Sequence, residues 1–231
     1  NATGAAIRVP SVLAVFGPTS VGKSEVAVAL SERFAKAGRR SVLVGADSMQ
    51  IYEGLSVISG AASEAQRARA DHRLIGCVPV GEEFSVAQYS ELAHFEIDAA
   101  LSRGDVPIVV GGTGLYLQAA LTDMPLRPPV PIAVEQALQA RLEAEGAQAL
   151  HSELAVKAPA AASRINLGDH RRLLRALALL AAGHSLDDQV GGIWTSQMRH
   201  QTRVIGLVRE RDELYARIGA RVDAIAAGGG A

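Results

Sequence analysis

Residues 17–24 read Gly17-Pro18-Thr19-Ser20-Val21-Gly22-Lys23-Ser24, a complete GxxxxGK[ST] phosphate-binding loop. The apolar run 11–16 precedes this phosphate loop and a helical pattern follows it, so the loop is predicted to join a strand to a helix. Its two glycines let backbone N–H groups turn inward around an anion, Lys23 adds a positive charge, and the Ser24 hydroxyl suits Mg²⁺. All eight residues are therefore predicted to bind a diphosphate or triphosphate, against the alternative of an ordinary glycine-rich turn.

Short β-branched runs alternate with longer helical patterns along the chain. Strands are predicted at 11–16, 41–45, 106–110 and 204–208. Helices are predicted at 23–37, 86–102, 114–121, 133–145, 147–156, 169–182 and 211–226. This alternation is typical of an α/β fold with a parallel sheet flanked by helices, and the phosphate loop makes it a fold of the P-loop NTPase type.

Strand signals disappear between Thr122 and Ser196, where amphipathic helical patterns follow a proline-rich entry. We therefore expect an all-helical insertion. The expected division is 1–122 for the first part of the P-loop core, 123–195 for the insertion and 196–231 for the return to the core. Because the chain starts without Met and stops in a glycine-rich run, we expect it to be a fragment at both ends, with a truncated core.

Composition narrows the class of protein only moderately. The 231 residues are 48% hydrophobic and 20% charged, which is ordinary for a soluble globular protein. The formal net charge of −1 neither favours nor excludes a nucleic-acid partner. The single cysteine, Cys77, favours a reducing cytoplasmic compartment, and no run is long enough for a membrane span. We expect a monomer and no membrane partner.

Two polar residues follow predicted strands. Asp47 comes just after the strand 41–45, and Thr113 follows the strand 106–110 in Gly111-Gly112-Thr113-Gly114. Because the carboxyl ends of parallel strands line one crevice, we expect both residues to meet the phosphate loop there, with Asp47 removing a proton from an acceptor. The alternatives are a helix cap or turn role for Asp47 and a turn hydroxyl for Thr113.

Other polar residues carry weaker signals. Gln50 has an amide that suits an adenine edge, although a surface glutamine is common. Arg171, Arg172 and Arg175 lie near the start of the helix 169–182, where they work against the helix dipole. They are predicted to bind RNA phosphates, and a solvated basic face is the equal alternative.

Arg221 lies within an apolar helical stripe of the last helix, formed by Leu214, Ile218, Val222 and Ile225. An inward guanidinium needs an anion, and a bound diphosphate would supply one. A structural salt bridge or a snorkelling side chain is the alternative.

Several motifs occur together in one order. They are residues 17–24, Asp47-Ser48-Met49-Gln50, His72-Arg73-Leu74-Ile75, Gly111-Gly112-Thr113-Gly114-Leu115-Tyr116, and the arginine-rich pattern from Arg164 to Leu177. This order strongly resembles the tRNA dimethylallyltransferases, also called tRNA isopentenyltransferases. The resemblance covers roughly Val12 to Ile225.

The resemblance implies a Mg²⁺-dependent transfer of a dimethylallyl group from dimethylallyl diphosphate to N6 of the adenosine 3′-adjacent to the anticodon of tRNA. It assigns Asp47 as the general base, Thr113 as a residue near the acceptor, and Lys23 and Arg221 to the diphosphate. Ser24 would hold Mg²⁺. Contacts with the tRNA anticodon stem-loop are expected from Asp47, Ser48, Met49, Gln50, Thr113, Arg171, Arg172 and Arg175.

The chain also departs from that family. A lysine common in the family after Tyr52 is absent near Ala61 and Ala62, and an arginine is replaced near Gln139. Family members continue beyond residue 231. Three alternatives stay open: a small-molecule kinase that binds ATP, an enzyme that prenylates adenine nucleotides, and a non-catalytic RNA-binding remnant.

Overall fold

The computed structural model describes residues 11–82, 84–126, 130–186 and 197–227. The chain divides into two compact units, one of residues 1–124 with 195–231 and the other of residues 125–194. The expected boundaries were 122/123 and 195/196, and the second of these lies outside the described residues. Each unit is described below by itself.

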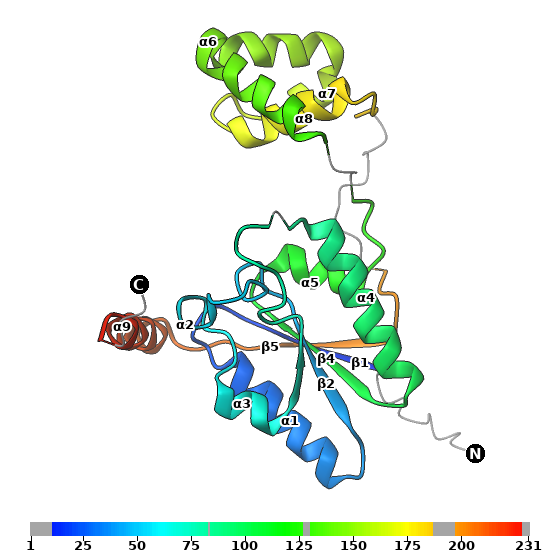
Figure 1. Ribbon diagram of the computed structural model, residues 1–231, viewed down its shortest axis with the longest axis vertical. Coiled ribbons are helices and arrows are strands. Elements are labelled where there is room, and N and C mark those ends of the chain that lie inside the picture. Colours follow the sequence, from blue (N-terminus) through cyan, green and yellow to red (C-terminus); the bar gives the residue numbers. More distant parts are fainter. Residues whose placement is uncertain (1–10, 83, 127–129, 187–196, 228–231) are drawn as a thin grey trace, which may run out of the picture. The chain divides into compact units, whose positions relative to one another are not determined.

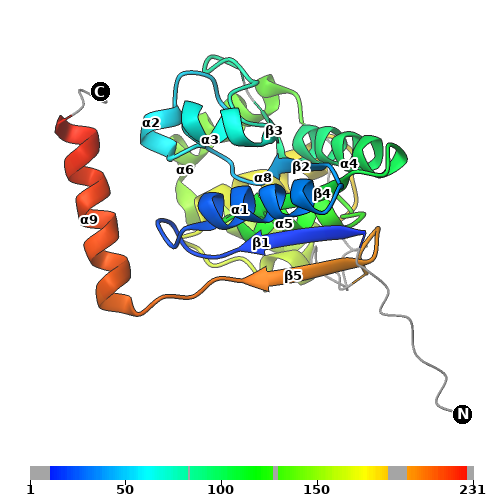
Figure 2. The ribbon, with the colours of Figure 1, turned by 90° about the horizontal axis from the view of Figure 1, so that it is seen from below.

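A five-stranded parallel sheet forms the centre of the first unit. Its strands are β1 (Val12–Phe16), β2 (Ser41–Gly45), β3 (Asp71–Arg73), β4 (Val106–Gly111) and β5 (Thr202–Gly206). Their order in the sheet is β3-β2-β4-β1-β5, with every pairing parallel. The predicted α/β fold of the P-loop NTPase type is confirmed. Figure 2 shows β5 beside β1 at one edge of the sheet, leading into the last helix.

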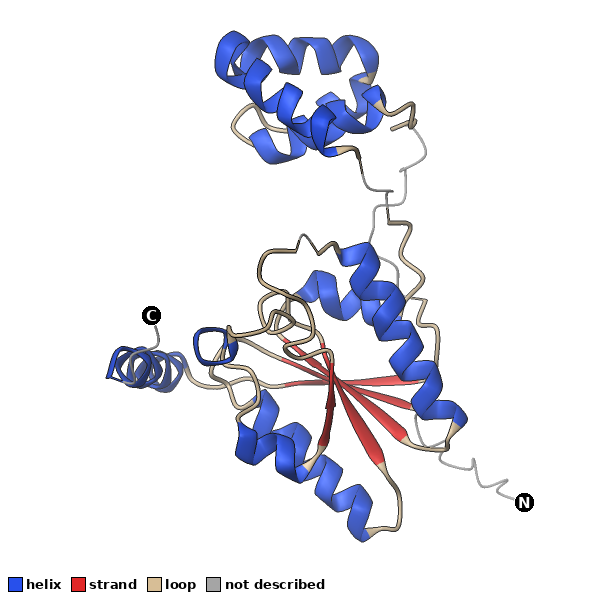
Figure 3. Ribbon diagram, viewed as in Figure 1, coloured by secondary structure: helices blue, strands red, loops and turns tan. Residues whose placement is uncertain are grey.

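Helices flank this sheet on both faces (Figures 1 and 3). The longer ones are α1 (Lys23–Lys36), α4 (Val86–Ser102) and α5 (Gly114–Leu121), while α9 (Arg211–Ala227) follows β5 and lies beyond the edge of the sheet (Figure 2). The short ones are α2 (Ser56–Ser59) and α3 (Glu64–Arg69). Apolar side chains of the sheet, including Leu13 and Ile108, pack against Val28 of α1. This packing orients the start of α1, and with it the phosphate loop.

The predicted strands 11–16, 41–45 and 106–110 are confirmed to within one residue. The last strand spans 202–206 and not the predicted 204–208, because its register is set by pairing with β1. The strand β3 and the helices α2, α3 and α7 were not predicted. Each has only three to six residues, too few for a hydrophobic period to show.

The second unit is helical in its described residues. It contains α6 (Ile132–Lys157), α7 (Pro159–Ala162) and α8 (His170–Ala181). Gly146 has non-helical dihedral angles, φ 80° and ψ 162°, so α6 consists of two segments that correspond to the two predicted helices 133–145 and 147–156. The unit has a core of its own, in which Leu150, Leu154 and Leu173 are fully buried.

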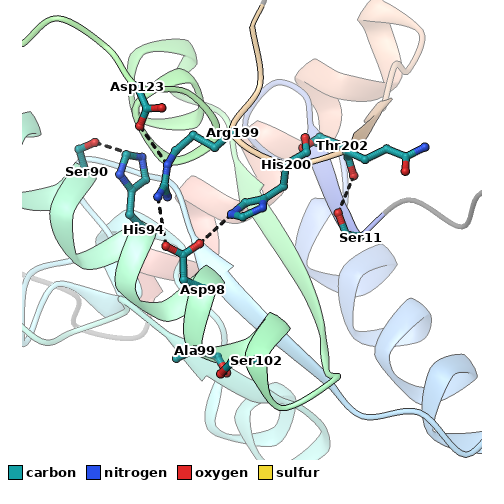
Figure 4. A network of polar contacts seen from close by, with 11 residues as sticks. Ser11, Ser90, His94, Asp98, Ala99, Ser102, Asp123, Arg199, His200 and Thr202 are labelled. Carbon is teal, nitrogen blue, oxygen red and sulfur yellow. Dashed lines mark hydrogen bonds and ion pairs between the residues drawn. The ribbon is translucent and has the colours of Figure 1, made fainter.

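A polar network marks the place where the chain leaves the first unit and returns to it (Figure 4). Arg199 donates from Nη2 to Asp98 at 3.1 Å, and its Nε lies 3.0 Å from an oxygen of Asp123. His200 pairs with the other oxygen of Asp98 at 2.7 Å. Asp98 lies on α4, Asp123 follows α5 and Arg199 precedes β5, so the network joins three segments of one unit.

Candidate functional site

The phosphate loop has the backbone shape that its glycines predict. Gly22 takes φ 106°, and Ser20 takes φ 63° although it is not glycine. A side chain at Gly17 would place Cβ only 2.8 Å from the Leu207 carbonyl oxygen, so glycine is required there. The ammonium group of Lys23 donates to the Pro18 carbonyl at 2.8 Å. The lysine is thereby held over its own loop.

The end of β4 packs closely against the end of β2 and against the phosphate loop. A Cβ at Gly111 would overlap the Ala46 carbonyl oxygen, and a Cβ at Gly112 would lie 3.3 Å from Nζ of Lys23. These two glycines therefore let three segments meet, as expected for the carboxyl ends of parallel strands.

A cavity of about 480 Å³ opens at this edge of the sheet. Eight of the predicted site residues line it, out of fourteen that lie in the first unit. Its lining consists of Thr19, Ser20, Gly22, Lys23, Ser24, Glu25, Asp47, Gln50, Ser59, Gly60, Gln66, Arg217, Ala220 and Arg221. The other six in the first unit, Gly17, Pro18, Val21, Ser48, Met49 and Thr113, are not part of this lining, and Arg171, Arg172 and Arg175 belong to the second unit. Thr113 directly precedes α5 and follows Gly112, the neighbour of Lys23.

Charges of both signs meet in the cavity. Asp47 is half-buried and its Oδ1 accepts a hydrogen bond from the Met49 N–H at 3.0 Å. Burial lowers the pKa of Lys23 below its ordinary value, the negative charge of Asp47 raises it, and the positive charge of Arg221 lowers it further. Lys23 is therefore close enough to both Asp47 and Arg221 for their charges to affect its pKa.

Two buried tyrosines support the end of β2 behind Asp47. The Tyr89 hydroxyl donates to the Gly45 carbonyl at 2.9 Å, and the Tyr89 ring lies 4.5 Å from that of Tyr116, between centroids. Burial raises the pKa of both phenols, and Asp47 contributes in the same direction. Both tyrosines therefore stay neutral beside the carboxylate.

Gln50 has a structural role in the turn that follows α2. Its Nε2 donates to the carbonyl oxygens of Ser59 at 3.4 Å and Gly60 at 3.3 Å, which anchors the turn after α2. The amide predicted to bind an adenine edge is therefore the same group that holds this turn.

The helix α9 brings arginines to the cavity. Arg221 is half-buried, as are Leu214, Ile218 and Ile225 of the predicted stripe, whereas Val222 is 57% exposed. Nη2 of Arg221 donates to the Ile58 carbonyl at 2.9 Å. The guanidinium packs directly over Gly60, because a Cβ there would overlap it.

Sequence reasoning missed Arg217 and Ser59. Arg217 lies one helical turn before Arg221, and its Nε donates to the Ser20 carbonyl at 2.8 Å. That i, i+4 spacing was the available signal for Arg217. Ser59 had no signal in the sequence, because its place depends on how the segment after Asp47 folds back.

The arginines of α8 belong to the second unit. Arg172 lies 3.4 Å from Asp169, and Arg175 donates to Glu135 at 3.3 Å, so both have carboxylate partners within that unit. Arg171 is exposed. Gln139, on α6, donates to Glu143 at 3.0 Å. The predicted RNA contacts of these arginines stay predictions.

Two kinds of feature are missing from the described ranges. Among residues 11–82, 84–126, 130–186 and 197–227, no three His, Cys, Asp or Glu side chains gather into a metal-binding group. In the same ranges, none of the helices combines the length and the apolar character that crossing a bilayer requires.

Family models match most of the chain. A model described as IPP transferase matches residues 50–231, and one described as isopentenyl transferase matches residues 10–77. A tRNA dimethylallyltransferase of Rhodospirillum centenum is 43% identical over 91% of this chain and 66% of its own length. One of Bradyrhizobium sp. is 38% identical over 93% of this chain and 70% of its own. The chain thus spans about two thirds of the length of these relatives.

Solved structures of the same family are also similar to this chain. The tRNA isopentenylpyrophosphate transferase of Bacillus halodurans is 32% identical, with a TM-score of 0.60 over 94% of this chain and 66% of its own. A eukaryotic dimethylallyltransferase acting on tRNA has a TM-score of 0.76 over 94% of this chain and 53% of its own. At 23% identity, that second likeness concerns the fold.

Proposed function

The chain belongs to the IPP transferase family, and we propose that it transfers a dimethylallyl group from dimethylallyl diphosphate to N6 of the adenosine 3′-adjacent to a tRNA anticodon. The observation that carries the proposal is the cavity in which Asp47, at the end of β2, meets the phosphate loop and Arg221. A diphosphate needs the cations, and an amine that becomes alkylated needs a base.

The proposed reaction is a substitution at the allylic carbon. N6 of adenosine forms a bond to that carbon while the carbon–oxygen bond to the diphosphate breaks, and the diphosphate leaves with the electron pair. Asp47 takes the proton from N6. Lys23 and Arg221 neutralise charge that accumulates on the leaving group, which lowers the energy of the transition state more than that of the bound substrate.

We propose Mg²⁺ as the cofactor, held by the Ser24 hydroxyl. The donor set fits this ion, because Mg²⁺ usually binds one or two protein oxygens and completes its shell with phosphate oxygens and water. Ser24 lines the cavity, and the carboxylate of Glu25 lines it too. When bound, the ion neutralises charge on the diphosphate.

We propose that the tRNA contacts come from both units. Ser48, Met49, Gln50 and Thr113 are the candidates around the adenosine, which has to leave its stack to reach Asp47. Arg171, Arg172 and Arg175 are the candidates for backbone phosphates. For Arg172 and Arg175, binding a phosphate would compete with Asp169 and Glu135.

The test is a labelling reaction with the 231-residue chain, radiolabelled dimethylallyl diphosphate, Mg²⁺ and a tRNA with adenosine 3′ of the anticodon. We expect label in the tRNA. Label in free AMP and none in tRNA would favour the nucleotide-prenylating alternative. Transfer of phosphate from ATP to a small molecule without prenyl transfer would favour the kinase. Binding of tRNA without transfer would favour the non-catalytic remnant.

The role of Asp47 has its own prediction. In Asp47→Ala, we expect the labelling rate to fall about 10²- to 10⁴-fold, because a general base contributes about that much. Binding of inorganic pyrophosphate, measured by calorimetry, should persist. The matched control is Glu91→Ala, which removes an exposed carboxylate of α4 outside the cavity. A labelling rate in Asp47→Ala within threefold of that control would contradict the assignment.

Two further expectations concern the state of the protein. We propose a monomer, which light scattering after gel filtration tests directly against the chain mass of 24.1 kDa. The cytoplasmic compartment stays a prediction that rests on the single Cys77, an exposed free thiol.

A further inference from the structure

Two serine hydroxyls of the cavity have no hydrogen-bond partner. In the described part of the chain, the buried side-chain polar atoms without a partner are Oγ of Ser20, Oγ of Ser59 and Nη1 of Arg199. Ser20 and Ser59 both line the cavity, whereas Arg199 does not. Two of the orphaned atoms therefore belong to the same site.

A buried hydroxyl without a partner is unusual, because buried polar groups are nearly always hydrogen-bonded. Leaving such a group unsatisfied lowers the stability of the folded chain. Two such groups at one cavity indicate partners that come with a ligand.

The backbone at both serines is firmly held. Ser20 has a left-handed φ of 63°, a conformation that non-glycine residues adopt at a cost, and its carbonyl accepts from Arg217 at 2.8 Å. The turn at Ser59 is held from two sides, because Arg221 donates to the Ile58 carbonyl at 2.9 Å and Gln50 to the carbonyls of Ser59 and Gly60. The backbone that carries each hydroxyl is thus fixed by hydrogen bonds to side chains that also line the cavity.

The surroundings define the ligand chemistry. Lys23, Arg217 and Arg221 line the same cavity, so the ligand atoms near the hydroxyls are oxygens of an anion. A serine hydroxyl donates one hydrogen bond, and such a bond is strongest when the acceptor is charged.

We propose that Ser59 is a diphosphate-binding residue, whose hydroxyl donates to a non-bridging oxygen, with Ser20 as its counterpart on the phosphate loop. This inference rests on the proposed function for the identity of the anion. It adds the turn after α2 as a second wall of the diphosphate site, joined through Gln50 to the place proposed for the adenosine.

The experiment measures the affinity for inorganic pyrophosphate with Mg²⁺ by calorimetry, together with the melting temperature of the unliganded chain. For Ser59→Ala we expect about tenfold weaker binding, since one hydrogen bond to a charged acceptor is lost. The melting temperature should be equal or higher, because an unsatisfied hydroxyl is removed. If Ser59 had only a structural role, the substitution would lower the melting temperature. Ser59→Thr keeps the hydroxyl and should bind within threefold of the original chain.

The control is Ser56→Ala, which removes an exposed hydroxyl at the other end of α2 and should change neither quantity. Pyrophosphate affinity of Ser59→Ala equal to that of the control would overturn the inference, as would a joint loss of binding and melting temperature. Absence of pyrophosphate binding by the original chain would overturn it too. Weakened binding in Ser59→Ala combined with no tRNA labelling by the original chain would support the anion site and contradict the proposed transfer.

Discussion

Lys23 is the side chain on which opposing effects in the cavity converge. Burial and the charge of Arg221 lower its pKa, while Asp47 raises it. A lysine with a lowered pKa loses its charge at a lower pH than an exposed lysine does. Because an anion binds better to the protonated form, the pH at which anion binding weakens reports the combined effect of burial, Asp47 and Arg221 on Lys23.

We expect pyrophosphate affinity to fall as the pH rises through the lowered pKa of Lys23, below its ordinary value of 10.5. Asp47→Asn removes the charge that raises this pKa, so the fall should move to lower pH. Arg221→Ala removes a charge that lowers it, so the fall should move to higher pH, at a weaker overall affinity. Calorimetry over a pH series, corrected for the ionisation of pyrophosphate, measures both shifts.

The control for this titration is Lys23→Arg, which keeps a positive charge throughout the range and should show no such fall. Shifts of the same sign in Asp47→Asn and Arg221→Ala would contradict the assignment of the titrating group to Lys23.

The strands β4 and β5 both end in glycine, but only one of these glycines is required by packing. Gly111 and Gly206 are the last residues of β4 and β5, and both lie opposite Phe16 of β1. Their surroundings differ, because a Cβ at Gly111 would overlap the Ala46 carbonyl oxygen and a Cβ at Gly206 would meet nothing within 4 Å. Only the first glycine is required by close packing, although both end a strand in the sequence.

We expect Gly111→Ala to reduce the free energy of unfolding by about 1–3 kcal/mol, because a rigid backbone carbonyl has to move. Gly206→Ala, the matched control, should change it by less than about 1 kcal/mol. Urea denaturation of both variants measures the difference. Equal effects of the two substitutions would show that the close approach of β4 to Ala46 does not limit stability.

The two units have separate apolar cores, so the molecule as a whole depends on how the chain passes between them. Asp123 and Arg199 lie near the points of exit and return, and both belong to the first unit. Arg199 also pairs with Asp98, and its backbone N–H donates to the Leu121 carbonyl at 2.9 Å. The exit and return segments are thereby tied to each other and to α4 (Figure 4).

We expect Arg199→Ala to lower the free energy of unfolding of the first unit by about 1 kcal/mol. The effect is modest because Asp123 is 82% exposed and water screens its charge. Hydrogen exchange at residues 121–124 should become faster. Arg73→Ala removes an exposed ion pair with Asp71 on β3 and serves as the control, with unchanged exchange at those residues. Unchanged exchange in Arg199→Ala would show that the network does not hold the exit segment.

Much of the site follows from local sequence, because a glycine-rich loop between a strand and a helix forms its anion-binding shape from its own backbone. The loop 17–24 and the position of Asp47 after β2 were predictable for this reason. The three-residue strand β3 was not, since Asp71-His72-Arg73 has no apolar period and becomes a strand only by pairing with β2.

By itself, the sequence determined the fold class, the phosphate loop and the helical insertion, since each depends on neighbouring residues and on hydrophobic period. Only the tertiary structure decided that Ser59 and Arg217 share one cavity with Ser20 and Arg221. Arg217 and Ser20 are 197 positions apart, and Arg221 and Ile58 are 163 apart. Contacts over such separations depend on how the packed sheet places distant segments, which no local pattern encodes.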